Sequence, residues 1–126
     1  EIPLEKVSYY GVTSGKWIDS KEMVLSMSNI TEKPTAAYAE EHLGVGSPKG
    51  ERSYYCAFGT YILTPDVFSQ LKENIANNVV NAKGEVELTT ALEQVRVKDG
   101  LLGIELDGKM FDIGVPSELR KTIFSY

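Results

Sequence analysis

Segments with the composition of β-strands alternate with segments of helical periodicity, and this alternation restricts the fold more than any other feature of the sequence. Residues 7–12 are rich in β-forming residues and predict a strand closed by the turn residues 13–15, and residues 23–30 alternate as a second strand does. Thr35 is placed to cap a short helix over residues 36–41. Strands and helices that interleave in this way predict an α/β layer with a mixed sheet.

The middle of the chain contains its clearest helix. The stretch Gly44–Arg52, whose first glycine stops the preceding helix, holds three glycines and a proline and predicts a mobile loop. Residues 54–63 predict a long strand inside the sheet. Thr64 and Pro65 then suit the N-cap and the first position of a helix, because proline has no N–H to lose there. We expect the inward face of this helix to carry Val67, Phe68, Leu71 and Ile75.

The last third of the chain predicts two more helices and a hairpin. A loop over residues 77–84 leads to an amphipathic helix, marked by Leu88, Ala91, Leu92 and Val95, that ends near Asp99-Gly100. The Asp-Gly pair at 107–108 is typical of a tight turn, so residues 101–106 and 109–111 predict a hairpin. Pro116 opens a final helix with Leu119 and Ile123 facing inward.

Charge, cysteine content and apolar pattern exclude several classes of protein. Thirteen Lys and Arg against eighteen Asp and Glu give a net charge of −5, which lacks the field that attracts nucleic acid or anionic lipid. We therefore expect no nucleic-acid partner, and no apolar run approaches the ~20 residues that cross a membrane. The single histidine, His42, excludes a His-cluster metal site and argues against a Ser-His-Asp triad. The single cysteine, Cys56, fits a reducing compartment, so we expect a cytoplasmic protein.

The length of 126 residues suits one compact domain. The chain opens at Glu1 without a methionine and stops at Tyr126 inside a predicted helix, so we expect a piece of a longer protein.

Three short stretches carry candidate chemistry, and the first is Glu32-Lys33-Pro34 at a predicted strand end. Pro34 keeps Lys33 out of the α region, so two opposite charges are held side by side at the sheet edge. An exposed turn without function would look the same.

The other two stretches centre on carboxylates. Residues 84–89 place Glu85 and Glu87 just before a helix, where acidic residues also serve as partners of the helix dipole. Asp112 lies between apolar residues at a predicted strand end, just before Gly114. A carboxylate in such surroundings needs a partner, and a metal ion or a backbone N–H would serve equally well.

Taken in order, five motifs resemble the second half of the sugar-1-phosphate nucleotidyltransferases, the family of the glucose-1-phosphate uridylyltransferases and thymidylyltransferases. The motifs are Tyr10-Gly11-Val12, Glu32-Lys33-Pro34, residues 58–68 (FGTYILTPDVF), residues 84–89 (GEVELT) and residues 111–116 (FDIGVP). Each motif is weak alone, and their common order across almost the whole chain makes the signal strong. The resemblance implies the mixed-sheet C-terminal half of a Rossmann-like nucleotidyltransferase domain, without the N-terminal half that binds the nucleotide.

The resemblance also implies roles for single residues. Gly11 would let the backbone approach the sugar, Glu32 would accept hydrogen bonds from sugar hydroxyls, and Lys33 would pair with the sugar phosphate. Ala57 and Gly59 would offer backbone groups to the sugar.

Three further roles follow from the same resemblance. Tyr61 would stand behind the backbone groups that hold the sugar, and Glu85 would bind further hydroxyls from the far side. Asp112 would be one of two aspartates that hold a catalytic Mg²⁺. Catalysis would therefore rest on Lys33 and Asp112.

The reaction that the resemblance implies is an attack by a sugar 1-phosphate on the α-phosphorus of a nucleoside triphosphate, which releases pyrophosphate. The uridylyltransferases, with UTP and glucose 1-phosphate as substrates and UDP-glucose as product, fit residues 59–66 best. Residues 112–116 are nearer to the thymidylyl- and guanylyltransferases. The sequence also leaves open a homo-oligomer and a non-catalytic binding or regulatory copy.

The chain departs from the family pattern in three places. The Gly-rich triphosphate loop and the partner metal aspartate are absent, so we expect the chain alone to be inactive. Thr90 stands where most members have an aspartate, and the insert over residues 35–52 is longer than in the simplest members.

Overall fold

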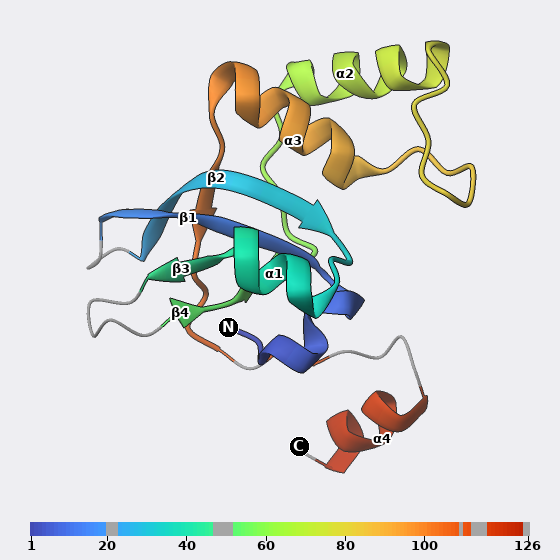
Figure 1. The fold of residues 1–126 in the computed structure, drawn as a ribbon. Coiled ribbons are helices and arrows are strands. Elements are labelled where there is room, and N and C mark those ends of the chain that lie inside the picture. The colour runs from blue at the N-terminus through green and yellow to red at the C-terminus, as the bar shows by residue number, and fades with distance from the viewer. Residues whose placement is uncertain (20–22, 47–51, 109, 112–115, 125–126) are drawn as a thin grey trace.

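The computed structural model describes residues 1–19, 23–46, 52–108, 110–111 and 116–124. A central sheet has the strand order β4-β3-β1-β2-β6, and a further strand, β5, pairs with β1 (Figure 1). β1 (Gly11–Asp19) is antiparallel to β2 (Val24–Glu32) and to β5 (Tyr55–Cys56), and parallel to β3 (Gly44–Gly46). β4 (Arg52–Ser53) and β6 (Leu102–Ile104) complete a mixed sheet, so the predicted fold class is confirmed.

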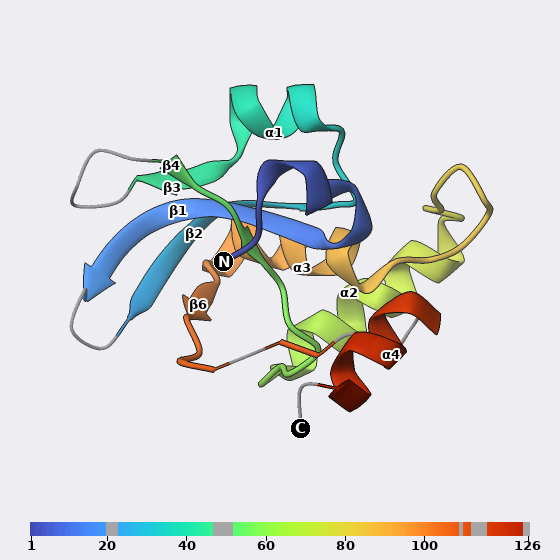
Figure 2. The same cartoon turned by 90° about the horizontal axis from the view of Figure 1, so that it is seen from below.

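Helices cover both faces of the sheet (Figure 2). One face carries a 3-10 helix, η1 (Leu4–Tyr9), and α1 (Ala36–His42). The other face carries α2 (Pro65–Ala76) and α3 (Leu88–Asp99), whereas α4 (Pro116–Phe124) lies apart near the end of the chain. Each face has its own apolar core: Ile2, Val7, Val12, Ala39 and Leu43 on the first, Ile30, Val67, Leu92 and Val95 on the second.

Three predicted helices form where the sequence placed them. The short helix α1 is capped as expected, because the Tyr38 N–H donates to Oγ1 of Thr35 at 3.2 Å. Pro65 occupies the first turn of α2, although the side chain of Thr64 makes no capping hydrogen bond. Gly100 ends α3 with a φ of +84°, a conformation that suits a residue without a side chain.

The first predicted strand was wrong in its position. Residues 4–9 form η1, because Val7 is drawn into the core beside α1, and packing overrides a weak preference for strand. The strand begins at Gly11 and runs through the predicted turn 13–15. There the hydroxyl of Thr13 donates to the Asn29 carbonyl at 2.8 Å. A Cβ on Gly15 would stand 2.3 Å from the Ser26 carbonyl oxygen, so only glycine fits this close strand contact.

The long strand predicted over residues 54–63 was also wrong. Only Tyr55 and Cys56 form strand β5, which pairs with Thr13 and Val12. One more hydrogen bond runs from the Ala57 N–H to the Gly11 carbonyl at 2.7 Å. Because β1 starts at Gly11, residues after Ala57 have no residue of β1 left to pair with. The chain therefore continues without regular structure to residue 64.

Two other predictions fail because distant segments pair instead. Part of the expected loop 44–52 forms β3 and β4 at the edge of the sheet, and its residues 47–51 lie outside the described part. The predicted hairpin around residues 107–108 is replaced by pairing of β6 with Val24, Leu25 and Ser26 of β2. Residues 110 and 111, two of the three residues of the expected second strand, have no regular structure, and residue 109 lies outside the described part.

The predicted inward faces of two helices are only partly right. Val67 of α2 is buried, as is Asn74, and Leu71 packs against the core, but Phe68 and Ile75 are 54% and 65% exposed. In α4, Leu119 and Ile123 are exposed as well. No helix among the described residues is long and apolar enough to span a membrane.

Candidate functional site

Four elements meet at one end of the sheet: the start of β1, the end of β2, the chain after β5 and the first turn of α3. Gly11 is the register partner of Glu32, which places the glycine backbone beside that carboxylate. A Cβ on Gly11 would lie 3.1 Å from Oε2 of Glu32 and 3.7 Å from both the Ala57 Cβ and Oγ1 of Thr89. The strand pairing of β1 with β2 and β5 therefore brings together Gly11, Glu32 and Ala57, as the sequence predicted.

The Glu32 carboxylate is held from two sides. Its Oε2 accepts a hydrogen bond from Oγ1 of Thr89 at 2.7 Å. Its Oε1 lies 3.3 Å from Nζ of Lys33. The Glu32 side chain is about one quarter exposed and that of Lys33 is 58% exposed, so the pair sits at the rim of the protein. The predicted fixed pair of opposite charges at the end of a strand is confirmed.

The backbone of Lys33 is unusual for a residue with a side chain. Its φ of +45° lies in the left-handed region, outside the right-handed α region that Pro34 disfavours. The Lys33 N–H donates to the Tyr10 carbonyl at 3.0 Å, which holds the turn onto the start of β1. The turn directs the ammonium group back onto Glu32 rather than along the strand.

Tyr61 lies in the electrostatic environment of the same carboxylate. Burial, and then the negative charge of Glu32, raise the pKa of the Tyr61 hydroxyl above its usual value. Tyr61 therefore remains a neutral hydrogen-bonding group at physiological pH. Eight site residues were predicted from the sequence. The structure brings five of them to one region: Gly11, Glu32, Lys33, Ala57 and Tyr61.

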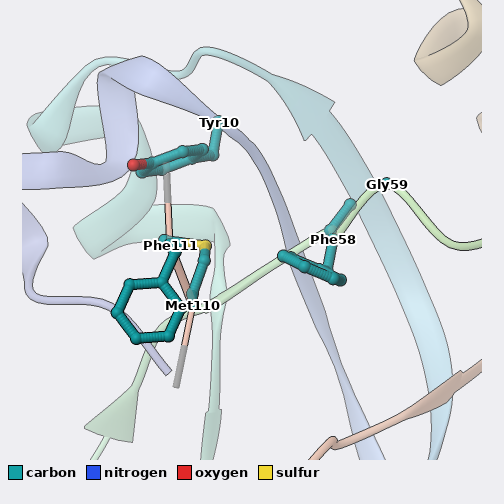
Figure 3. Close-up of a pocket in the computed structure, with 6 residues that line it drawn as sticks. Tyr10, Phe58, Gly59, Met110 and Phe111 are labelled. Carbon is teal, nitrogen blue, oxygen red and sulfur yellow. The ribbon is translucent and has the colours of Figure 1, made fainter. Parts of the chain in front are cut away.

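A shallow hollow of about 190 Å³ adjoins this cluster on the side of Ala57. It is lined by Tyr10, Ala57, Phe58, Gly59, Met110 and Phe111, and Figure 3 shows the aromatic rings around it. The sixth predicted residue, Gly59, thus borders the same region. Apolar walls with a few polar groups at the rim are typical of small-molecule sites.

The remaining two predicted residues have different outcomes. Glu85 lies in the turn before α3, where the Asn81 amide donates to its Oε2 at 3.2 Å and its own N–H donates to Oδ1 of Asn81 at 3.0 Å. No contact of Glu85 with Glu32 is recorded among the described residues. Asp112, the predicted metal ligand, lies outside the described residues.

The sequence prediction missed the roles of Thr89 and of the apolar lining. Thr89 closes the predicted stretch 84–89, and its position in the first turn of a helix was the available signal. Tyr10 and Met110 join the hollow only through the fold, because they lie on segments 100 residues apart. Cys56 lies beside Met110, with 3.9 Å between the two sulfurs, and burial raises the pKa of its thiol, which disfavours the reactive thiolate.

The chain is similar in sequence and in fold to part of one class of enzymes. No protein-family model matches the chain. A UTP–glucose-1-phosphate uridylyltransferase from Pseudomonas aeruginosa is 30% identical over 128 aligned residues, which cover 100% of this chain and 39% of that protein. Its counterpart from Streptococcus pneumoniae is 26% identical, over 99% of this chain and 36% of that protein.

Solved structures agree with these relatives. A UDP-glucose pyrophosphorylase crystallised with UDP-glucose matches 100% of this chain and 41% of its own, with a TM-score of 0.74 and 27% identity. The same enzyme type without ligand matches with a TM-score of 0.73 and 28% identity. The predicted resemblance is therefore confirmed in sequence and in fold, and the chain spans about two fifths or less of the relatives it matches.

Proposed function

We infer that this chain, which is related along its whole length to part of the UTP–glucose-1-phosphate uridylyltransferases, binds the sugar phosphate in a nucleotidyltransferase of that kind. The reaction would join a sugar 1-phosphate to a nucleoside triphosphate and release pyrophosphate, with UTP and glucose 1-phosphate as the favoured pair. The observation that carries the proposal is the convergence of Gly11, Glu32, Ala57 and Lys33 at one end of the sheet.

The arrangement suits a neutral ring that carries one phosphate. An ionised carboxylate accepts strong, directional hydrogen bonds from hydroxyl groups, and Glu32 has oxygen lone pairs beyond those used by its two protein partners. The exposed ammonium group of Lys33 is a compact charge that can neutralise a phosphate beside the sugar. Gly11 has no side chain, so the Glu32 carboxylate lies close to its backbone, where it would meet the approaching ring.

The protein would act mainly by position and charge. Glu32 and Lys33 would hold the sugar phosphate so that its oxygen faces the α-phosphorus of the bound nucleotide. Lys33 would offset the negative charge that gathers as the two phosphates meet. Tyr61, whose phenol is neutral at physiological pH, would add a hydroxyl near the same ring.

The proposed metal is Mg²⁺, which would supply charge neutralisation at the phosphates. The described residues include no group of three His, Cys, Asp or Glu able to hold a metal. One carboxylate from this chain would nevertheless fit, because Mg²⁺ in such sites is usually held by one or two carboxylates together with substrate phosphates. We propose Asp112 for that ligand.

A further part of the protein would bind the nucleotide. Support comes from apolar side chains that the described residues leave uncovered on β6 and just after it: Leu102, Ile104 and Leu106 are each more than 60% exposed. Leu102 and Ile104 lie two residues apart on the edge strand β6 and so share one face, and Ile62 is fully exposed. A surface of this kind is normally covered in a stable protein. The single free cysteine supports a cytoplasmic location.

Pyrophosphate release from UTP and glucose 1-phosphate tests the proposal. The full-length protein should release pyrophosphate with both substrates present, and residues 1–126 alone should release none. dTTP and GTP in place of UTP test the choice of base. A full-length protein that binds glucose 1-phosphate but shows no turnover with any triphosphate would favour a non-catalytic domain instead.

A further inference from the structure

Helix α3, which packs on β2 through the apolar cluster of Ile30, Leu92 and Val95, also makes two polar contacts with that strand next to the site. At the first, Oγ1 of Thr89 donates to Oε2 of Glu32 at 2.7 Å. At the second, one turn later on the helix, Oε2 of Glu93 accepts from the backbone N–H of Ile30 at 3.1 Å. Both contacts are polar, and both join the helix to the final residues of the strand.

The spacing of the two contacts matches on both elements. Thr89 and Glu93 are four residues apart on a helix, a rise of about 6 Å. Ile30 and Glu32 are two residues apart on a strand, a rise of about 6.6 Å. The helix and the strand therefore present their partners at nearly equal intervals.

The second contact is itself braced. Nε and the amino group NH2 of Arg96 donate to the two oxygens of Glu93, each at 2.7 Å, so the carboxylate is held in a bidentate pair. Ile30 lies in the part of β2 that has no pairing with β6, because β6 pairs only with residues 24–26. Glu93 thus supplies the acceptor that a neighbouring strand would otherwise provide.

The first contact fixes the orientation of the Glu32 carboxylate. Lys33 approaches Oε1 and Thr89 approaches Oε2, so neither oxygen is free to rotate toward the other partner. A glutamate has three side-chain torsions, and an unrestrained carboxylate would lose that freedom only when the sugar binds. Preorganisation of this kind lowers the cost of binding.

We propose that Thr89 is a positioning residue for Glu32, and that the Glu93–Arg96 pair sets the height of α3 against β2 so that the Thr89 hydroxyl reaches it. This inference rests on the proposed function, in which Glu32 accepts hydrogen bonds from the sugar. It gives α3 a role in sugar recognition through Glu32, without a direct contact between Thr89 and the substrate.

The test measures steady-state kinetics of the full-length protein with UTP and glucose 1-phosphate. Thr89→Val keeps the shape of the side chain and removes the hydroxyl, and we expect the KM for glucose 1-phosphate to rise about tenfold, the low end for a lost hydrogen bond to a charged group. The KM for UTP should stay unchanged. Thr89→Ser, which keeps the hydroxyl, should restore the wild-type KM to within about threefold, on the order of half a kcal/mol.

The matched control is Thr90→Val, the same change one position along the helix. Its hydroxyl points to Oε2 of Glu87 at 3.5 Å and not to Glu32, so the sugar-phosphate KM should not change. A double-mutant cycle with Glu32→Gln adds a readout that loss of structure would not give, because Thr89→Val should then have little further effect. If Thr89→Val fails to fold, Thr89→Ala carries the same test.

The outcomes separate the inference from the function on which it rests. A wild-type protein without turnover on any triphosphate contradicts the proposed function, and the inference with it. An active wild type in which Thr89→Val keeps its sugar-phosphate KM overturns the inference alone. Full additivity of the Thr89 and Glu32 changes would overturn it as well.

Discussion

Replacement of Gly11 by alanine tests the geometry of the site most directly, because the added methyl group points at the proposed sugar-binding carboxylate. The new Cβ would lie 3.1 Å from Oε2 of Glu32, closer than an ordinary contact. Its distances of 3.7 Å to the Ala57 Cβ and to Oγ1 of Thr89 are ordinary van der Waals contacts. The whole cost therefore falls on the position of the Glu32 carboxylate.

The size of the effect follows from these distances. To relieve the contact, the Glu32 carboxylate must move by a few tenths of an ångström. The hydrogen bond from Thr89 to this carboxylate is 2.7 Å long in the structure and stays within the normal range after such a shift. We therefore expect a loss of stability at the low end for overpacking, about 1 kcal/mol. The same shift misplaces the acceptor for the sugar, and a comparable loss of binding energy raises the KM for glucose 1-phosphate by about five- to tenfold.

The assay combines a melting curve with KM values for both substrates in the full-length protein. Gly46→Ala is the control, because none of the described residues lies within 4 Å of its added Cβ and its φ is not positive. The added Cβ of Gly59→Ala likewise meets no atom of the part of the chain that the structure describes, so a rise in the KM of this variant for glucose 1-phosphate would report contact with the sugar. A Gly11→Ala protein that loses stability but keeps the sugar-phosphate KM would refute the placement of the sugar beside Gly11.

Three further changes test single groups. Lys33→Ala should raise the KM for glucose 1-phosphate by one to two decades, about 1.5–3 kcal/mol for a lost charge-assisted contact, and leave the KM for UTP nearly unchanged. Equal effects on both KM values would mean that Lys33 belongs to an exposed turn without a role in sugar-phosphate binding. Asp112→Asn should lower kcat and recover in part as Mg²⁺ is raised, because mass action offsets weaker metal binding; normal kinetics at every Mg²⁺ concentration would exclude a metal ligand. Burial, then the charges of Glu105 and Glu1, raise the pKa of Tyr55 from 10.0 to about 12, so the folded chain holds this proton more tightly than the unfolded chain. That stability is present below pH 10 and is lost toward pH 12. In urea titrations the unfolding free energy of the wild type should therefore fall over this range relative to that of Tyr55→Phe, which has no titrating group at this position; a constant difference would contradict the shift.

The sequence was sufficient where local signals and packing agree. Thr35 before a helical run, Pro65 at a first turn and Gly100 at an end placed three helices correctly, because caps and stops act within a few residues. The pairing of Glu32 with Lys33 also followed from adjacent residues and the proline after them.

The rest depended on contacts between distant segments. Nothing local to residues 54–63 reveals that β1 begins at Gly11, so that most of these residues have no strand to pair with. Nothing local to residues 102–104 reveals that they pair with β2, which lies 80 residues earlier for the pair Val24 and Ile104, in place of a hairpin. The same reason hid the hydroxyl of Thr89 beside Glu32, which depends on how α3 lies across the sheet.

The left-handed backbone of Lys33 has a consequence for how such a chain changes under selection. A lysine at a φ of +45° costs the fold about 1–2 kcal/mol that a glycine there would not. Selection for stability alone would therefore favour replacement of this lysine by glycine. A need for the ammonium group of Lys33 opposes that replacement. A duplicated copy that lost the reaction would be expected to exchange Lys33 for glycine early, so the residue at this turn distinguishes a working copy from one retained for its shape.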